Sequence, residues 1–290
     1  RGRYSVGIFE TISTCTGRTG CYDQPLTIVW IGSNLAEASL GYIEVSKTRV
    51  LLLFGGQSAE HEVSVISARS VYAAMDRRRY EPILVGITRQ GCWLLAGSDA
   101  SILEHDTVDD MSLPIVYLAS ASQELKVSNA SSHERGVSFD VVFPLLHGPF
   151  GEDGTIQGLL ELVGMAYVGA GVAASSVGMD KALAKLIFNA SGLSQTAYQV
   201  IRRNCWHADA DAVVFNIEKP LPYPLFVKPA NMGSSVGVSK AIDVASLTKA
   251  LDIAAQYDVK MLVEESVEDC HEVECAVLGN DSPRASIIGE

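Results

Sequence analysis

The residues best suited to chemistry lie in the stretch KPANMGSSVGV, which runs from Lys228 to Val238. Lys228 follows an apolar run and therefore stands at the end of a predicted buried strand, facing a loop with two glycines and two serines. Glycine lets backbone N–H groups approach a polyphosphate, serine hydroxyls add donors, and lysine supplies a positive charge. The loop is neither a Walker A loop nor a G-x-G-x-x-G motif. A plain glycine-serine turn fits the same residues, so the loop alone leaves both interpretations open.

Other charged side chains are candidates for the same ligand. Lys181 stands just inside a predicted helix and would be a second cation for phosphate, although a solvated surface lysine is the commoner case. Glu264 and Glu265 end a predicted strand, where a carboxylate and backbone groups could meet a purine. Glu272 could accept hydrogen bonds from ribose hydroxyls. A charged strand end explains each of these glutamates equally well.

Two further candidates lie in the first half of the chain. Glu60 falls where a strand passes into a helix and could hold a substrate ammonium, but an acid in the first turn of a helix is also favourable for the helix itself. His147 ends a predicted strand beside a glycine, at the sheet edge where ligands bind in α/β folds. A structural histidine is the alternative there.

Elements that could position these residues alternate between strand and helix. Strands are predicted at 50–54, 82–87 and 141–146. Helices are predicted at 60–75, with Val63, Ile66, Val71 and Ala74 as its apolar face, and at 156–163. This alternation indicates a mostly parallel, doubly wound sheet that is covered on both faces.

The second half predicts a different, mixed arrangement. Asp180 can cap a helix that Gly192 ends, and strands at 225–227 and 261–263 flank a helix at 245–256. We therefore expect four parts, which are an unassigned extension at 1–47, an N-terminal substrate-binding α/β domain at 48–178, a central subdomain at 179–267, and the start of a third unit at 268–290.

Composition excludes several classes of protein. The chain has 290 residues, of which 48% are hydrophobic, and a formal net charge of −12. An acidic chain argues against nucleic-acid binding, which depends on clustered Lys and Arg. No apolar run is long enough for a membrane span. The six cysteines form no C-x-x-C pair, and no signal-peptide pattern begins the chain, so we expect reduced thiols in a cytoplasmic protein.

Several short motifs, taken in order, resemble one family. They are FGGQSAEHEVS at 54–64, HGPFGEDG at 147–154, MDK at 179–181, VKPANMGSSVG at 227–237, VE at 263–264 and EVE at 272–274. Each is weak alone, but their order and spacing closely resemble the D-alanine–D-alanine ligases of the ATP-grasp superfamily, from about residue 50 to the last residue. The resemblance implies that ATP phosphorylates one D-alanine and that a second D-alanine attacks the acyl phosphate, for peptidoglycan synthesis.

The family's site residues carry over to matching positions. The resemblance implies that Glu60 and Ser234 are catalytic and that, with His147, they bind the first D-alanine. It implies an ATP site formed by Lys181, Lys228, Gly233, Ser234, Ser235, Val236, Gly237, Glu264, Glu265, Val267 and Glu272. It also implies a homodimer that needs Mg²⁺ or Mn²⁺.

The family pattern continues past the end of this chain. In the family, the part that follows carries the substrate loop and the Asp, Glu and Asn ligands of Mg²⁺. We therefore expect no metal ligands among residues 1–290, and no dipeptide formation by this chain alone. Three readings remain at this point, which are the D-alanine–D-alanine ligase, a D-alanine–D-lactate ligase and an inactive nucleotide-binding fragment. A dinucleotide-binding oxidoreductase is disfavoured because Gly55 and Gly56 lack the required glycine spacing.

Overall fold

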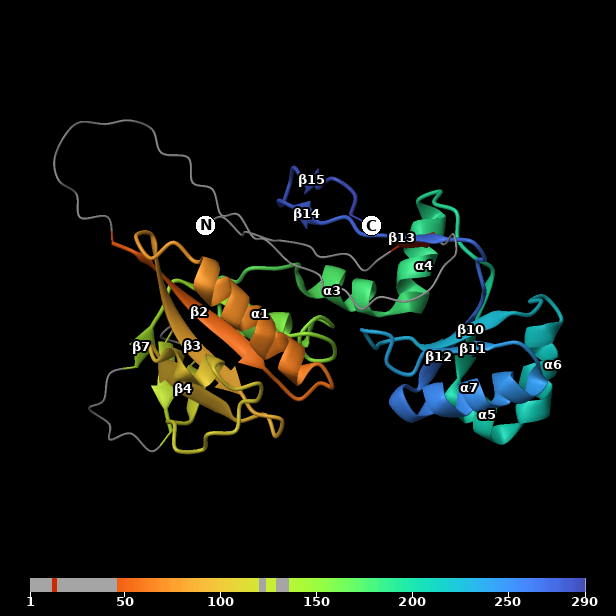
Figure 1. The fold of residues 1–290 in the computed structure, drawn as a ribbon, viewed down its shortest axis with the longest axis horizontal. Coiled ribbons are helices and arrows are strands. Elements are labelled where there is room, and N and C mark those ends of the chain that lie inside the picture. Colours follow the sequence, from red (N-terminus) through yellow and green to blue (C-terminus); the bar gives the residue numbers. More distant parts are fainter. Residues whose placement is uncertain (1–11, 15–45, 120–123, 129–135, 290) are drawn as a thin grey trace.

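The computed structural model describes residues 12–14, 46–119, 124–128 and 136–289. Two α/β bodies lie end to end in it, one built around β2 and the other around β10 and β12, with two green helices running between them (Figure 1). None of the described helices is long and apolar enough to cross a bilayer.

The first body is built on a four-stranded sheet with the strand order β4-β3-β2-β8. Its strands are β2 (Thr48–Gly55), β3 (Tyr80–Ile87), β4 (Trp93–Gly97) and β8 (Val141–Pro144). β2 pairs in parallel with β3 and β8, whereas β4 is antiparallel at one edge. The predicted mostly parallel sheet is therefore confirmed.

Both faces of this sheet are covered, but by different elements. Helix α1 (His61–Ala74) and the short 3₁₀ helix η1 (Ala100–Leu103) pack on one face. On the other face, helix α2 (Thr155–Leu162) packs beside a small antiparallel sheet of β5 (Val116–Ala119), β6 (Glu124–Val127) and β7 (Val137–Ser138). Strands buried on both faces read as continuous apolar runs, as the fully buried segment 50–54 does.

Helix α1 is turned differently from the prediction. Its buried residues are His61, Ser64, Val65 and Ala68, whereas Ile66 is 40% exposed. Polar partners explain the difference. The buried Ser64 hydroxyl donates to Leu145 O at 2.5 Å and accepts from the Gly55 N–H at 2.8 Å, so this polar side chain takes an inward position.

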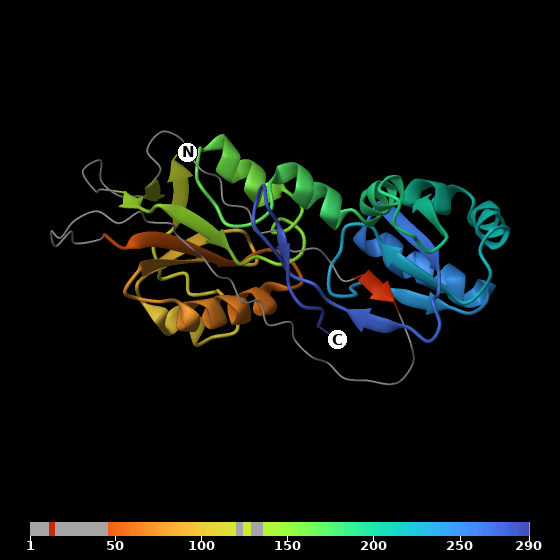
Figure 2. The ribbon, with the colours of Figure 1, turned by 90° about the horizontal axis from the view of Figure 1, so that it is seen from above.

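Two helices connect the bodies. Helix α3 (Val172–Met179) leads directly into α4 (Lys181–Ala190), and seen from above they run in succession toward the second body (Figure 2). Asp180 caps α4, as predicted, because its carboxylate accepts from the N–H groups of Ala182 and Leu183 at 3.1 and 3.2 Å.

The second body contains an entirely antiparallel sheet with the order β11-β10-β12-β9. Its strands are β9 (Tyr198–Arg202), β10 (Leu225–Pro229), β11 (Ser239–Ala241) and β12 (Lys260–Glu265). One face packs on α5 (Arg203–Ala208), α6 (Ala210–Glu218) and α7 (Val244–Tyr257). α4 covers part of the other face, where Ala182 contacts Ala230 and Leu262.

The chain ends in short strands, β13 (His271–Val273), β14 (Val277–Leu278) and β15 (Arg284–Ala285). β1 (Ile12–Thr14) pairs with β13 from within the segment that the sequence left unassigned. Cys92, Cys205 and Cys275 are free thiols, as expected, but the expectation was wrong for Cys270, which is disulfide-bonded. Cysteine spacing alone cannot show such a pair.

Candidate active site

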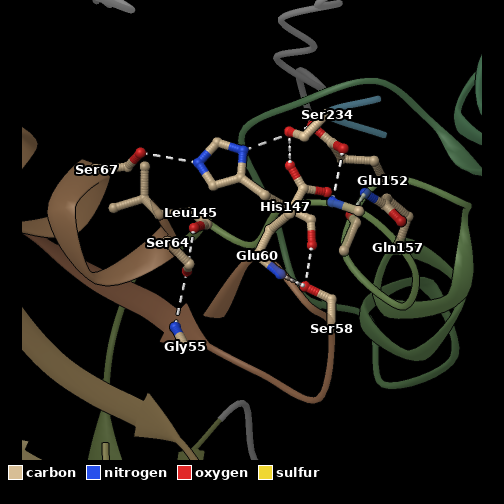
Figure 3. Close-up of polar contacts among 12 residues, drawn as sticks. Gly55, Ser58, Glu60, Ser64, Ser67, Leu145, His147, Glu152, Gln157 and Ser234 are labelled. Atoms are coloured by element: carbon tan, nitrogen blue, oxygen red, sulfur yellow. Dashed lines mark hydrogen bonds and ion pairs between the residues drawn. The ribbon is translucent and has the colours of Figure 1, made fainter. Parts of the chain in front are cut away.

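The candidate site lies where the carboxyl edge of the first sheet meets the glycine-serine loop of the second body. Figure 3 shows Glu60, His147 and Ser234 gathered there from three separate segments. Ligands of open parallel sheets bind at this edge. A cavity of about 170 Å³ opens at the same edge, lined in part by Gly55, Ser58 and His147.

Glu60 occupies the first position before α1 but does not cap the helix with its side chain. Its carboxylate instead accepts a hydrogen bond from the Ser234 hydroxyl, 174 residues further along the chain. The residue is only 9% exposed, and it takes part in none of the ion pairs that the structure describes. A buried carboxylate without a cation is costly, so the site suits a positively charged ligand group.

Glycines make room for the Glu60 carboxylate. A Cβ atom on Gly148 would lie 2.4 Å from Glu60 Oε2, and one on Gly233 would lie 3.0 Å from the same oxygen. Gly148 also has φ 69°, a conformation that favours glycine. A side chain at either position would therefore push on the Glu60 carboxylate, and at Gly148 it would also strain the backbone.

His147 is held from both sides of its ring. Ser67 Oγ lies 2.8 Å from His147 Nε2, and Glu152 Oε1 lies 3.8 Å from His147 Nδ1 (Figure 3). The backbone carbonyl of His147 also accepts from the Ser58 hydroxyl at 2.7 Å, and Ser58 in turn accepts from the Glu60 N–H. Ser58 thus joins the backbones of His147 and Glu60.

The glycine-serine loop is anchored at its base and turned tightly at its tip. The Ala230 N–H donates to Lys260 O at 2.9 Å, and both nitrogens of Asn231 donate to Asp258 Oδ2 at 2.8 Å. At the tip, Ser234 and Ser235 have positive φ angles of 45° and 57°. Such non-glycine residues cost about 1–3 kcal/mol each and cluster at ligand-binding loops.

Both predicted phosphate lysines adjoin this loop. Lys181 Nζ donates to Met232 O at 2.5 Å, directly before the first loop glycine. Lys228 lies on β10, on the sheet face opposite the core, because its neighbour Val227 is buried among the core side chains. The two lysines and the loop are therefore close together, as the sequence analysis expected.

Glu264 faces the same side of the second sheet as Lys228. It is 8% exposed, and its carboxylate forms ion pairs with Lys228 and with Lys185, the latter at 3.1 Å. Glu265 and Val267 are exposed and follow at the strand end, where the Glu265 N–H donates to Ala197 O. Glu272 is exposed on β13, and no described contact joins it to the lysines.

Sequence reasoning missed Lys185, Ser67 and Glu152. The signal for Lys185 was available, because Lys181 and Lys185 stand four residues apart on one helix and so share a face. Ser67 lies two turns inside α1, and nothing in its spacing singled it out. Glu152 was part of a quoted motif, but its contact with His147 depends on the fold of the loop.

The described residues do not suit a bound metal ion. They bring together no group of three His, Cys, Asp or Glu side chains.

Comparisons with known proteins point to the same family for both halves of the chain. A family model described as the D-ala D-ala ligase N-terminus matches residues 49–170, and one described as the D-ala D-ala ligase C-terminus matches residues 187–290. D-alanine–D-alanine ligases of Acetivibrio thermocellus and Ruminiclostridium cellulolyticum are each 47% identical to this chain, over 257 and 255 residues. They cover 84% and 85% of the chain, which in turn covers 68% of each.

Solved structures are similar as well. The VanG D-Ala:D-Ser ligase from Enterococcus faecalis superposes with a TM-score of 0.73 at 33% identity. The match covers 84% of this chain and 69% of the VanG chain. The D-alanine–D-alanine ligase from Coxiella burnetii gives 0.72 at 33% identity, covering 83% and 70%.

The fold and its similarity to these structures define a ligase in which an α/β body with a mostly parallel sheet adjoins a second body with an antiparallel sheet. More particularly, the chain belongs to the D-alanine–D-alanine ligase family. The curated relatives reported above favour this reading over a D-lactate ligase, an inactive fragment or an oxidoreductase.

Proposed function

We propose that this protein serves the ATP-dependent joining of two D-alanines into D-alanyl-D-alanine. The observation that carries the proposal is the hydrogen bond from Ser234 to the buried carboxylate of Glu60. It joins the loop suited to phosphate with the acid suited to an ammonium, so that a carboxylate substrate and a nucleotide would meet between them.

Binding of the first D-alanine would use opposite charges. Its ammonium would pair with Glu60, which lacks a cation among the described ion pairs, and Ser234 would donate to the same substrate region. His147, held by Ser67, would orient the substrate carboxylate for phosphorylation. Correct orientation of reacting groups supplies much of the rate enhancement in such reactions.

Binding of ATP would use the open face of the second sheet. Lys181, Lys228 and the loop residues 233–237 would neutralise the phosphates. Glu264, Glu265 and Val267 would surround the adenine, and Glu272 would contact the ribose. The γ-phosphoryl group would pass to the D-alanine carboxylate, releasing ADP, and the amine of the second D-alanine would then displace phosphate from the acyl phosphate.

The finer parts of the proposal follow from family membership. We propose a cytoplasmic, homodimeric enzyme of peptidoglycan synthesis, and thus of cell-wall formation and cell shape, with a requirement for Mg²⁺ or Mn²⁺. We also propose the division into parts at 1–47, 48–178, 179–267 and 268–290; the family matches at 49–170 and 187–290 support the boundary near residue 178. The expectation that these 290 residues alone form no dipeptide stays a prediction.

Calorimetric titration with ATP tests the nucleotide site. Wild-type protein should bind ATP, and Lys228→Ala should bind at least about tenfold more weakly, because a phosphate loses a charged partner. Lys219→Ala is the matched control, since Lys219 is an exposed lysine at the end of α6 and should leave affinity unchanged. Equal affinities of wild type and Lys228→Ala would remove Lys228 from the phosphate site.

A further inference from the structure

Lys185 lies in a position that the proposed reaction does not yet use. Its side chain is 15% exposed, and its ammonium lies between two elements of the second body. It donates to Thr196 Oγ1 at 2.9 Å, lies 3.1 Å from Glu264 Oε2, and stands 5.1 Å from the centre of the Tyr198 ring. Three separate partners thus fix one lysine against the open sheet face.

Glu264 is the carboxylate on which this arrangement depends. Its side chain is 11% exposed, and its two oxygens face two different lysines, Oε1 toward Lys228 and Oε2 toward Lys185. The three side chains together carry one net positive charge. Removing one partner from a buried ion pair is strongly destabilising when it leaves the other charge uncompensated.

Nucleotide binding would redistribute these charges. Lys228 is the more exposed of the two lysines, at 25%, and it stands on the strand that leads into the glycine-serine loop. If Lys228 turns toward a phosphate, its attraction to Glu264 weakens. Glu264 then needs a second cation that stays in place, and the contacts of Lys185 with Thr196 and Tyr198 hold it there.

We infer that Lys185 is a positioning residue for nucleotide binding: it neutralises Glu264 permanently and thereby frees the charge of Lys228 for the phosphates. The inference rests on the proposed ATP site. Lys185 itself touches no nucleotide in this account, because its ammonium is already engaged by Glu264 and Thr196.

A double-mutant cycle tests the inference. Lys185→Met removes the charge and should raise the Kd for ATP at least about tenfold, because Lys228 is then retained by Glu264. In a Glu264→Gln background no carboxylate needs neutralising, so adding Lys185→Met should change the Kd less than about twofold. Lys185→Arg keeps the charge and should bind ATP within about threefold of wild type.

The outcomes separate the explanations. If Lys185→Met weakens ATP equally in both backgrounds, Lys185 acts directly or only through folding, and the inference is wrong. If Lys185→Arg is as damaging as Lys185→Met while its thermal unfolding matches wild type, charge is not the reason and the inference also fails. If the wild-type protein binds no ATP at all, the proposed function fails first, which is a distinct result.

Discussion

The hydroxyl of Ser234 donates a hydrogen bond to the carboxylate of Glu60, joining a loop of the second body to the sheet edge of the first. Glu60 is buried and takes part in none of the described ion pairs. The bond keeps the carboxylate satisfied while no ammonium is present. A substrate ammonium adds the charge that the site otherwise lacks.

Glu60→Gln should raise the Kd for D-alanine at least about tenfold while leaving the Kd for ATP unchanged, because the substrate ammonium loses a charge-assisted partner. Glu81→Gln is the matched control, since Glu81 is exposed at the start of β3, away from the carboxyl edge, and takes part in none of the described ion pairs. Calorimetric titration of both variants with each ligand measures this, and similar D-alanine affinities in wild type and Glu60→Gln would contradict the assignment.

Ser67→Ala should weaken D-alanine binding about three- to tenfold, because the imidazole of His147 loses a hydrogen bond of about 1 kcal/mol that fixes its orientation. Ser70→Ala is the control one turn away, where the hydroxyl donates only to the exposed helix backbone at Ile66 O. The affinities are measured by competition with a labelled D-amino acid. Equal losses in both variants would point to a general effect on α1.

Gly148→Ala should lose D-alanine binding, because the new Cβ would lie 2.4 Å from Glu60 Oε2 and the backbone there has φ 69°. Gly158→Ala is the opposite case, since Gly158 lies in α2 with open space around it, and helix propensity should raise stability by about 0.5–1 kcal/mol. Thermal melts and D-alanine titrations distinguish the two, and retained binding by Gly148→Ala would show that the carboxylate can shift.

Asp180→Ala should lower the free energy of unfolding by about 2–4 kcal/mol, because it removes a helix cap and leaves Lys260 without its largely buried partner. Asp243→Ala removes the exposed cap of α7, which has no such ion pair among the contacts described for it, and should cost about 1 kcal/mol. Urea unfolding measures both. Equal losses would mean that the Lys260 ion pair contributes nothing.

The ion pair of Glu62 with Arg89 should make stability depend weakly on acid pH. The Arg89 guanidinium lowers the pKa of the Glu62 carboxyl below its usual 4.5 by hydrogen bonding to it. A lowered folded-state pKa contributes stability that is present above the unfolded value and is lost as the pH falls through the folded one. Because the pair is half-exposed, the contribution should stay below about 1 kcal/mol.

Urea midpoints of wild type and Glu62→Gln, compared at pH 7 and at pH 3, test this. The difference between the two proteins should shrink at the lower pH, because the Glu62 carboxyl of the unfolded chain is then largely protonated and the pH moves toward the lowered pKa of the folded state. A difference that grows on acidification would show that Glu62 has another partner.

Much of the fold was predictable because its strands are buried. The run 50–54 was recognisable as a strand covered on both faces, and Asp180 as a helix cap. The inward face of α1 was not predictable from hydrophobic spacing, because buried His61 and Ser64 are held there by hydrogen bonds. The His61 Nε2 accepts from the Val108 N–H at 3.0 Å, a contact with a residue 47 positions away.

The site was predictable as a set of motifs but not as a network. Lys181, Lys228 and the loop were expected to meet because their motifs together resemble one family's ATP site, although each was weak alone. The contact between Lys185 and Glu264 depends on how α4 lies over the open sheet face, which no local pattern specifies. The small antiparallel sheet beside α2 was also unexpected, since its strands are only four, four and two residues long.

Alternation along β10 has a consequence for evolution as well as for folding. Val227 points into the hydrophobic core while Lys228, one residue on, points to the opposite face. An insertion or deletion of a single residue in this strand would exchange the two faces. The lysine ammonium would then lie in the hydrophobic core, and the valine would lie on the face proposed to bind the phosphates. A variant that loses nucleotide binding in this way would also lose folding stability. Selection for a stable core therefore also keeps Lys228 on the open face.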